Sequence, residues 1–116
     1  MLAEIESPRA TEPIAMLTLT TRVKNRTVEP EPVYGGYANA RGEIFLFGES
    51  LVYRVNFKNQ TVQQRPPLNS GAQARYDAVG AGEAFEYCNV PFRRLSNAQI
   101  VEVCESGSFR VTPKIV

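Results

Sequence analysis

Alternation of apolar and polar residues, with a period of two, is the dominant pattern of the chain from about Ile14 onward. The clearest case is the segment 51–57, in which every second side chain is apolar: Leu51, Tyr53, Val55 and Phe57. Arg54 and Asn56 fall on the other face. A period of two is typical of a strand with one buried face. The pattern therefore predicts a fold built mainly from β-strands.

Turn residues divide this pattern into short segments. Strands are predicted over residues 14–24, 43–47, 51–57, 61–65, 83–90, 99–104 and 109–116. The segment 61–65 is polar and precedes two prolines, so it is predicted to be an edge strand. Pro91 is predicted to interrupt the strand pattern. The last two segments are predicted to pair as a hairpin.

The remaining stretches are rich in glycine, proline or alanine. Residues 34–42 are predicted to form a long loop, because glycine tolerates backbone conformations that other residues avoid. Residues 29–32 contain Pro30 and Pro32 and are predicted to be extended but outside any central strand. The alanine-rich segment 72–79 predicts one short helix near these residues, with Gly80 as its C-cap.

The length of 116 residues corresponds to a single domain. Residues 1–13 carry Pro8 and Pro13 and are predicted to form an extended N-terminal arm. Residues 14–116 are predicted to form a single β domain. We expect an all-β, antiparallel architecture with about seven to eight strands, for which a sandwich, a jelly roll or a small barrel all fit.

The charge of the chain is balanced, with 13 basic and 12 acidic residues and a net charge of +1. A dedicated nucleic-acid-binding protein usually carries a clear basic excess, so this composition argues against that class. The N-terminus lacks the pattern of a signal peptide, and no apolar run is long enough to span a membrane. The sequence therefore predicts a cytoplasmic protein, or a component of an intracellularly assembled particle, with no membrane partner.

The chain contains no histidine, which removes the commonest general base and the Ser-His-Asp arrangement. Two cysteines without histidine are too few ligands for a typical zinc site, and no cofactor motif is present. Cys88 and Cys104 are interpreted as small buried side chains, although spacing alone leaves a disulfide open. The carboxylate pairs Glu83/Glu86 and Glu102/Glu105 are interpreted as solvated surface. The sequence therefore predicts a protein that is not an enzyme and uses neither metal nor cofactor.

Two groups of residues are candidate interaction sites. Tyr34 and Tyr37 lie in the glycine loop, where they either face a protein partner or fold back over the core. Phe92, Arg93 and Arg94 form a basic and aromatic cluster. Together with four more residues, this cluster would suit stacking of a single-stranded nucleic acid, as in oligonucleotide-binding barrels: Tyr53, Arg54, Phe57 and Lys58. In the alternative reading the aromatic rings belong to the core and the arginines pair with glutamates.

These observations favour a non-enzymatic structural or assembly protein, acting as a subunit of a larger particle or complex. A virion component, such as a capsid-decorating or tail-associated protein, is the concrete form of this hypothesis. Its partners would be further copies of itself or other subunits, with the arm adding a strand to a neighbour or wrapping it. The alternative hypothesis is a single-stranded nucleic-acid-binding module of the oligonucleotide-binding-barrel type.

Overall fold

The structure, a computed structural model, describes residues 12–20 and 30–112. Within these ranges it contains ten strands and two helices. In chain order they are β1 (Ala15–Leu17), β2 (Leu19–Thr20), β3 (Glu31–Val33), β4 (Gly35–Asn39), β5 (Ile44–Phe47), β6 (Val52–Asn56), β7 (Thr61–Arg65), α1 (Ser70–Asp77), β8 (Ala84–Tyr87), β9 (Val90–Arg94), α2 (Asn97–Cys104) and β10 (Phe109–Val111). The predicted all-β class and the predicted short helix are confirmed.

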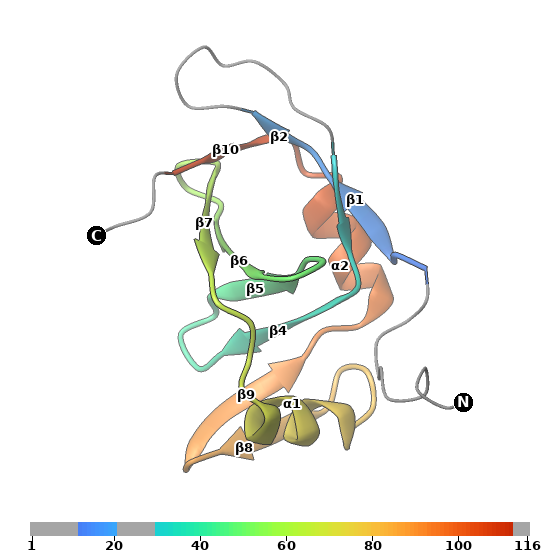
Figure 1. The fold of residues 1–116 in the computed structure, drawn as a ribbon, viewed down its shortest axis with the longest axis vertical. Helices are drawn as coiled ribbons and strands as arrows, with labels where there is room; N and C mark the ends of the chain where they lie inside the picture. The colour runs from blue at the N-terminus through green and yellow to red at the C-terminus, as the bar shows by residue number, and fades with distance from the viewer. Residues whose placement is uncertain (1–11, 21–29, 113–116) are drawn as a thin grey trace.

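One large, open sheet has the strand order β2-β10-β7-β6-β5-β4-β9-β8, while β1 and β3 form a separate antiparallel pair. In Figure 1 this sheet runs from β2 and β10 at the top to β9 and β8 at the bottom, and it curls on the way. All neighbouring strands in the part of the sheet ordered β7-β6-β5-β4-β9-β8 pair antiparallel. In contrast, β10 pairs in parallel with both β2 and β7. The sheet does not close, so the barrel alternative is not formed.

Each face of the sheet packs against one helix. On the inner side of the curl, α2 and β1 cover a core that includes Leu46, Tyr53 and Val62 (Figure 1). The opposite face carries a second cluster, in which Tyr76 of α1 packs against aromatic and branched side chains of the sheet: Tyr37, Phe47, Val52 and Phe85. Burial of each such side chain stabilises the fold by about 1.5–3 kcal/mol. Both faces are therefore covered near the middle of the sheet.

The strand that shows the clearest alternation is covered on both faces. Tyr53 and Val55 are buried in the inner core, as predicted, but Val52 is also buried, on the face of α1. Phe57 is 43% exposed and lies in the turn after β6, so its predicted burial is wrong. The hairpin between β5 and β6 is confirmed.

The predicted terminal hairpin is wrong, because residues 97–104 form α2. Ser96 and Gln99 form a capping box, in which Ser96 Oγ accepts the backbone N–H of Gln99 and the Gln99 side chain accepts that of Ser96. Ile100, Val103 and Cys104 then bury one helical face against the inner core. β-Branched residues favour strands locally, and here the capping and the burial override that preference.

The predicted loop over residues 34–42 is also wrong, because β4 runs through it and pairs with β5 and β9. Glycine is required at Gly35, where an added Cβ would lie 2.6 Å from the hydroxyl of Tyr76. At Gly36 it would lie 2.7 Å from the backbone oxygen of Phe45. These glycines permit close packing and are not signs of a turn.

Three smaller expectations also differ from the structure. The segment 61–65 is not an edge strand, because β10 pairs with its first two residues. Pro91 does not interrupt the strand pattern, because it lies within β9. The cap of α1 is Ala78 and not Gly80. The predicted strand 14–24 is described only to residue 20, where it is divided into β1 and β2, and most of the predicted arm lies outside the described residues.

Candidate functional site

A row of aromatic rings crosses one end of the sheet on the face that carries α1. The rings of Phe85 and Phe92 stack at 5.4 Å, and Phe92 meets Tyr37 edge to face at 5.6 Å. Tyr37 stacks in turn on Phe45 at 4.8 Å with an interplanar angle of 7°. The strand register explains the row, because Phe85 opposes Phe92 and Tyr37 opposes Phe45. Four strands thus contribute one continuous aromatic surface.

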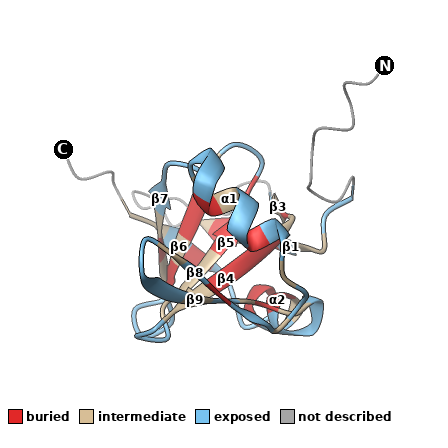
Figure 2. Ribbon diagram, turned by 90° about the horizontal axis from the view of Figure 1, so that it is seen from below, coloured by how far each residue is buried: buried red, intermediate tan, exposed pale blue. Residues whose placement is uncertain are grey.

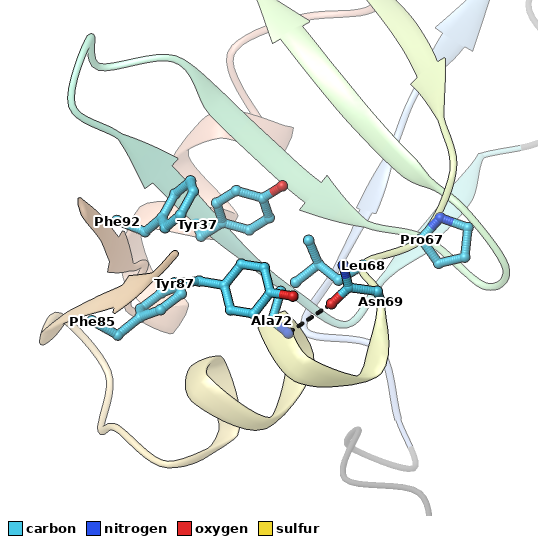
Figure 3. A pocket seen from close by; sticks show the side chains of 8 residues that line it. All are labelled: Tyr37, Pro67, Leu68, Asn69, Ala72, Phe85, Tyr87 and Phe92. Carbon is cyan, nitrogen blue, oxygen red and sulfur yellow. Dashed lines mark hydrogen bonds between the residues drawn. The ribbon is translucent and has the colours of Figure 1, made fainter. Parts of the chain in front are cut away.

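Part of this surface forms the floor of a cavity of about 250 Å³ (Figure 3). The cavity is bounded by the start of α1, by the segment before it and by the sheet, and its lining residues are Tyr37, Pro67, Leu68, Asn69, Ala72, Phe85, Tyr87 and Phe92. None of these residues carries a charge at neutral pH. Their polar groups are two phenol hydroxyls and one amide. Such a lining suits an apolar or aromatic group that makes one or two hydrogen bonds.

The wall of the cavity is positioned by the entry into α1. Pro66 and Pro67 end β7 and keep the chain extended as it leaves the sheet. Asn69 then caps the helix, because its side-chain oxygen accepts the backbone N–H of Ala72 at 2.9 Å (Figure 3). This places the small side chain of Ala72 against the cavity and leaves room for a ligand.

The helix is fixed to the sheet at its other end by Tyr76 and Arg94. The Tyr76 hydroxyl accepts the buried backbone N–H of Gly36 at 3.2 Å. The guanidinium of Arg94 lies 4.5 Å from the centre of the Tyr76 ring. It donates to the carbonyl oxygens of Tyr76 and Val79, at 3.2 and 2.7 Å, where α1 ends. A cation at the C-terminus of a helix satisfies carbonyl groups that lack an intrahelical partner.

Burial favours the neutral form of the Tyr37 phenol in the cavity lining. Burial raises the pKa of the Tyr37 hydroxyl, and the positive charge of Arg65 partly opposes this effect. The Tyr37 hydroxyl is therefore protonated at neutral pH and available as a hydrogen-bond donor. A proton-transfer role at neutral pH is unfavourable for such a group.

The cavity brings together two of the five predicted site residues, Tyr37 and Phe92, while Arg94 lies opposite Tyr37 in the sheet but outside the cavity lining. Tyr37 is buried in β4 and not exposed on a loop, yet it faces the cavity together with Phe92 (Figure 3). Tyr34 is half-buried and lies outside the cavity, with its hydroxyl donating to Glu49 at 3.4 Å. The interaction role of these residues remains a prediction.

The predicted stacking groove is not assembled. Arg93 and Arg94 fall on opposite faces of β9, and Arg93 donates to the carbonyl oxygen of Gly82 at 2.8 Å. Arg94 is occupied by the end of α1. Tyr53 is only 2% exposed. Neither arginine pairs with a glutamate within the described residues.

The two cysteines are free, so the open disulfide alternative is not realised. Cys104 is buried at the end of α2, as predicted, and burial raises its thiol pKa to about 11. Cys88 is exposed, which contradicts its predicted burial. It lies with Asn89 in the two-residue turn between β8 and β9, and both have positive φ, as a type I′ turn requires.

The cavity residues Phe85, Tyr87, Leu68 and Asn69 were not predicted as a site. The available signals were the alternation through Phe85 and Tyr87 and the N-cap residue Asn69, but neither indicates that the two segments meet. Across the described residues, no cluster of three or more histidine, cysteine, aspartate or glutamate side chains is placed to hold a metal ion. No helix in the described ranges is long and apolar enough to cross a membrane.

Comparison with known proteins yields no match among family models, curated proteins or solved structures.

Proposed function

We propose that this protein is a non-enzymatic assembly subunit that binds a protein partner by holding one of the partner's apolar side chains in the aromatic cavity. The observation that carries this proposal is the cavity lining, in which four aromatic rings and no charged group surround about 250 Å³. Buried aromatic contacts contribute much of the binding energy in protein interfaces. A capsid-decorating or tail-associated role is the concrete form that we favour.

The proposed partner group is an aromatic or large aliphatic side chain. The rings of Phe85 and Phe92 offer apolar contact, and the Tyr37 and Tyr87 hydroxyls are the phenol groups of the lining that would bind backbone groups of the partner. Nucleic acid is the weaker candidate, because Arg94 is occupied by α1 and, among the described residues, Arg65 is the one cation that acts on the Tyr37 hydroxyl. Affinity for phosphate needs several available cations.

A displayed library of random peptides, selected on the immobilised full chain, tests this proposal. We expect the selected peptides to share one aromatic or large aliphatic residue. Binding of a selected peptide should weaken at least about tenfold in Tyr87→Ala, which removes a wall, and in Ala72→Met, which fills the cavity. The matched control is Phe57→Ala, because Phe57 is an exposed aromatic residue outside the cavity. Selection of no peptide, or of peptides insensitive to both cavity variants, contradicts the proposal.

A further inference from the structure

Strand β8 is the last strand of the large sheet, and its outer edge is unpaired within the described part of the chain. The backbone N–H of Arg94 donates to the carbonyl oxygen of Glu83 at 2.9 Å. Because hydrogen-bonded pairs alternate along an antiparallel ladder, the backbone groups of Phe85 and Tyr87 also point toward β9. Those of Ala84 and Glu86 therefore point outward. Figure 2 shows the β8–β9 hairpin largely exposed, with α1 to one side.

The side chains on the far face of this hairpin form a charge pattern that complements itself. Ala84 opposes Arg93, and Glu86 opposes Pro91, all on the face away from the aromatic row. The cation Arg93 thus lies beside the small residue Ala84, and in the next cross-strand pair on this face the anion Glu86 lies beside the uncharged Pro91. Ala84, Pro91 and Arg93 also line a shallow hollow of about 280 Å³, together with Asn39, Ala40 and Phe92. The hollow gives space for a side chain from a partner.

We propose that two copies of this chain associate by antiparallel pairing of β8 with β8 across a twofold axis at Phe85. This contact uses the strand edge and not the cavity, so it goes beyond the function proposed above. Ala84 of each copy then pairs with Glu86 of the other, and each pair exchanges both of its backbone hydrogen bonds. Phe85 meets its own symmetry mate, which extends the aromatic row into the second copy.

The charges disfavour one neighbouring register. Moving the pairing by one step along the ladder, so that Glu86 opposes Glu86, would place like charges directly opposite each other, which is destabilising. In the proposed register Glu86 of one copy lies beside Ala84 of the other, with Arg93 one strand further on. Neighbouring strands are about 4.8 Å apart, so the two charged residues are about 10 Å apart at their Cα atoms. Glutamate and arginine side chains together span that distance over the small alanine.

Sedimentation velocity of the full chain over a range of concentrations tests the contact. We expect a dimer that dissociates on dilution. Glu86→Pro removes an outward-pointing N–H while leaving the ladder to β9 intact, and it should weaken dimerisation at least about tenfold. A chain that remains monomeric up to about 1 mM overturns the proposal. So does a dimer that Glu86→Pro leaves unchanged.

A charge exchange provides a second test that does not depend on proline. Glu86→Arg places two arginines together across the contact and should weaken the dimer at least about tenfold. The double variant Glu86→Arg with Arg93→Glu should recover affinity to within about threefold of the wild type. Glu102→Arg is the matched control, because it makes the same charge change on the exposed surface of α2. Far-UV circular dichroism confirms folding of each variant, and absence of recovery in a folded double variant overturns the proposed register.

Discussion

The contact between Tyr76 and β4 gives the sharpest prediction about stability. Tyr76 is 5% exposed, and its hydroxyl is the partner of the buried backbone N–H of Gly36. Tyr76→Phe keeps the ring against Phe47 and Phe85, so little packing is lost. A buried donor without a partner costs about 1–3 kcal/mol. We therefore expect the free energy of unfolding to fall by about 1–3 kcal/mol in Tyr76→Phe.

Gly35 makes this prediction more specific. A Cβ at Gly35 would lie 2.6 Å from the Tyr76 hydroxyl but 3.5 Å from the ring carbon that bears it. Gly35→Ala should therefore destabilise the wild type by about 1–3 kcal/mol, the usual effect of overpacking. In the Tyr76→Phe background the closest clash disappears, so the same substitution should cost less. The double variant should be more stable than the sum of the single effects predicts, by at least about 0.5 kcal/mol.

Urea unfolding followed by far-UV circular dichroism measures these differences, because the chain has no tryptophan to report by fluorescence. The m-values should equal that of the wild type, because each variant should expose the same amount of surface on unfolding. Tyr87→Phe is the control, since Tyr87 is only half-buried, and we expect less than about 0.5 kcal/mol. A similarly small effect of Tyr76→Phe, or strict additivity with Gly35→Ala, would refute the reasoning.

Three further predictions follow from titratable groups. In the native protein a thiol reagent should modify Cys88 and spare Cys104, whose thiol is buried with a pKa of about 11. The variant Cys88→Ser should therefore show no labelling in the native state. Rapid labelling of that variant would contradict the burial of Cys104. Hydrogen bonds from Asn39 and Arg54 lower the pKa of Glu43, so its contribution to stability is present above its unfolded pKa and is lost as the pH falls through the folded value. Urea midpoints at neutral and acidic pH should thus differ less in Glu43→Gln than in the wild type, and an equal difference would count against the network. Burial, with Glu31 nearby, raises the pKa of Tyr53 to about 12. The contribution of Tyr53 to the free energy of unfolding is therefore present below pH 10 and is lost between about pH 10 and 12. Tyr53→Phe should lose less stability than the wild type over that range, and an equal loss would exclude Tyr53 as its cause.

The sequence predicted strands well where apolar and polar residues alternate between turn residues. The hairpin of β5 and β6 follows from alternation and a short turn, and α1 follows from its alanines. The prediction was wrong where packing reverses a local preference. Gly35 and Gly36 look like loop residues, but they are needed because Tyr76 and the backbone of Phe45 approach β4 closely.

The helix α2 was predictable in part. Ser96 and Gln99 have the spacing of a capping box, and Ile100, Val103 and Cys104 repeat at helical intervals. The β-branched residues among them favour a strand by local propensity. The inner core decides between the two, because β1 and β4 are placed to bury one helical face there.

The candidate site was less predictable than the fold. Tyr37 and Phe92 were singled out from the sequence, but as members of two unrelated groups. Their contact depends on the register that places β9 beside β4. Tyr87 and Asn69 give no local sign that they share a cavity, because they come from β8 and from the segment before α1.

The sequence by itself determined the all-β class, because a period of two is the spacing of side chains that share one face of a strand. It also determined the presence of a short helix near residues 72–79, which the alanine-rich segment predicts and α1 confirms. Only the tertiary structure decided the strand order, the parallel pairing of β10, the cavity and the position of β8 at the edge of the sheet formed by the described residues. These features depend on contacts between residues far apart in the chain, and such contacts leave no pattern in any single segment.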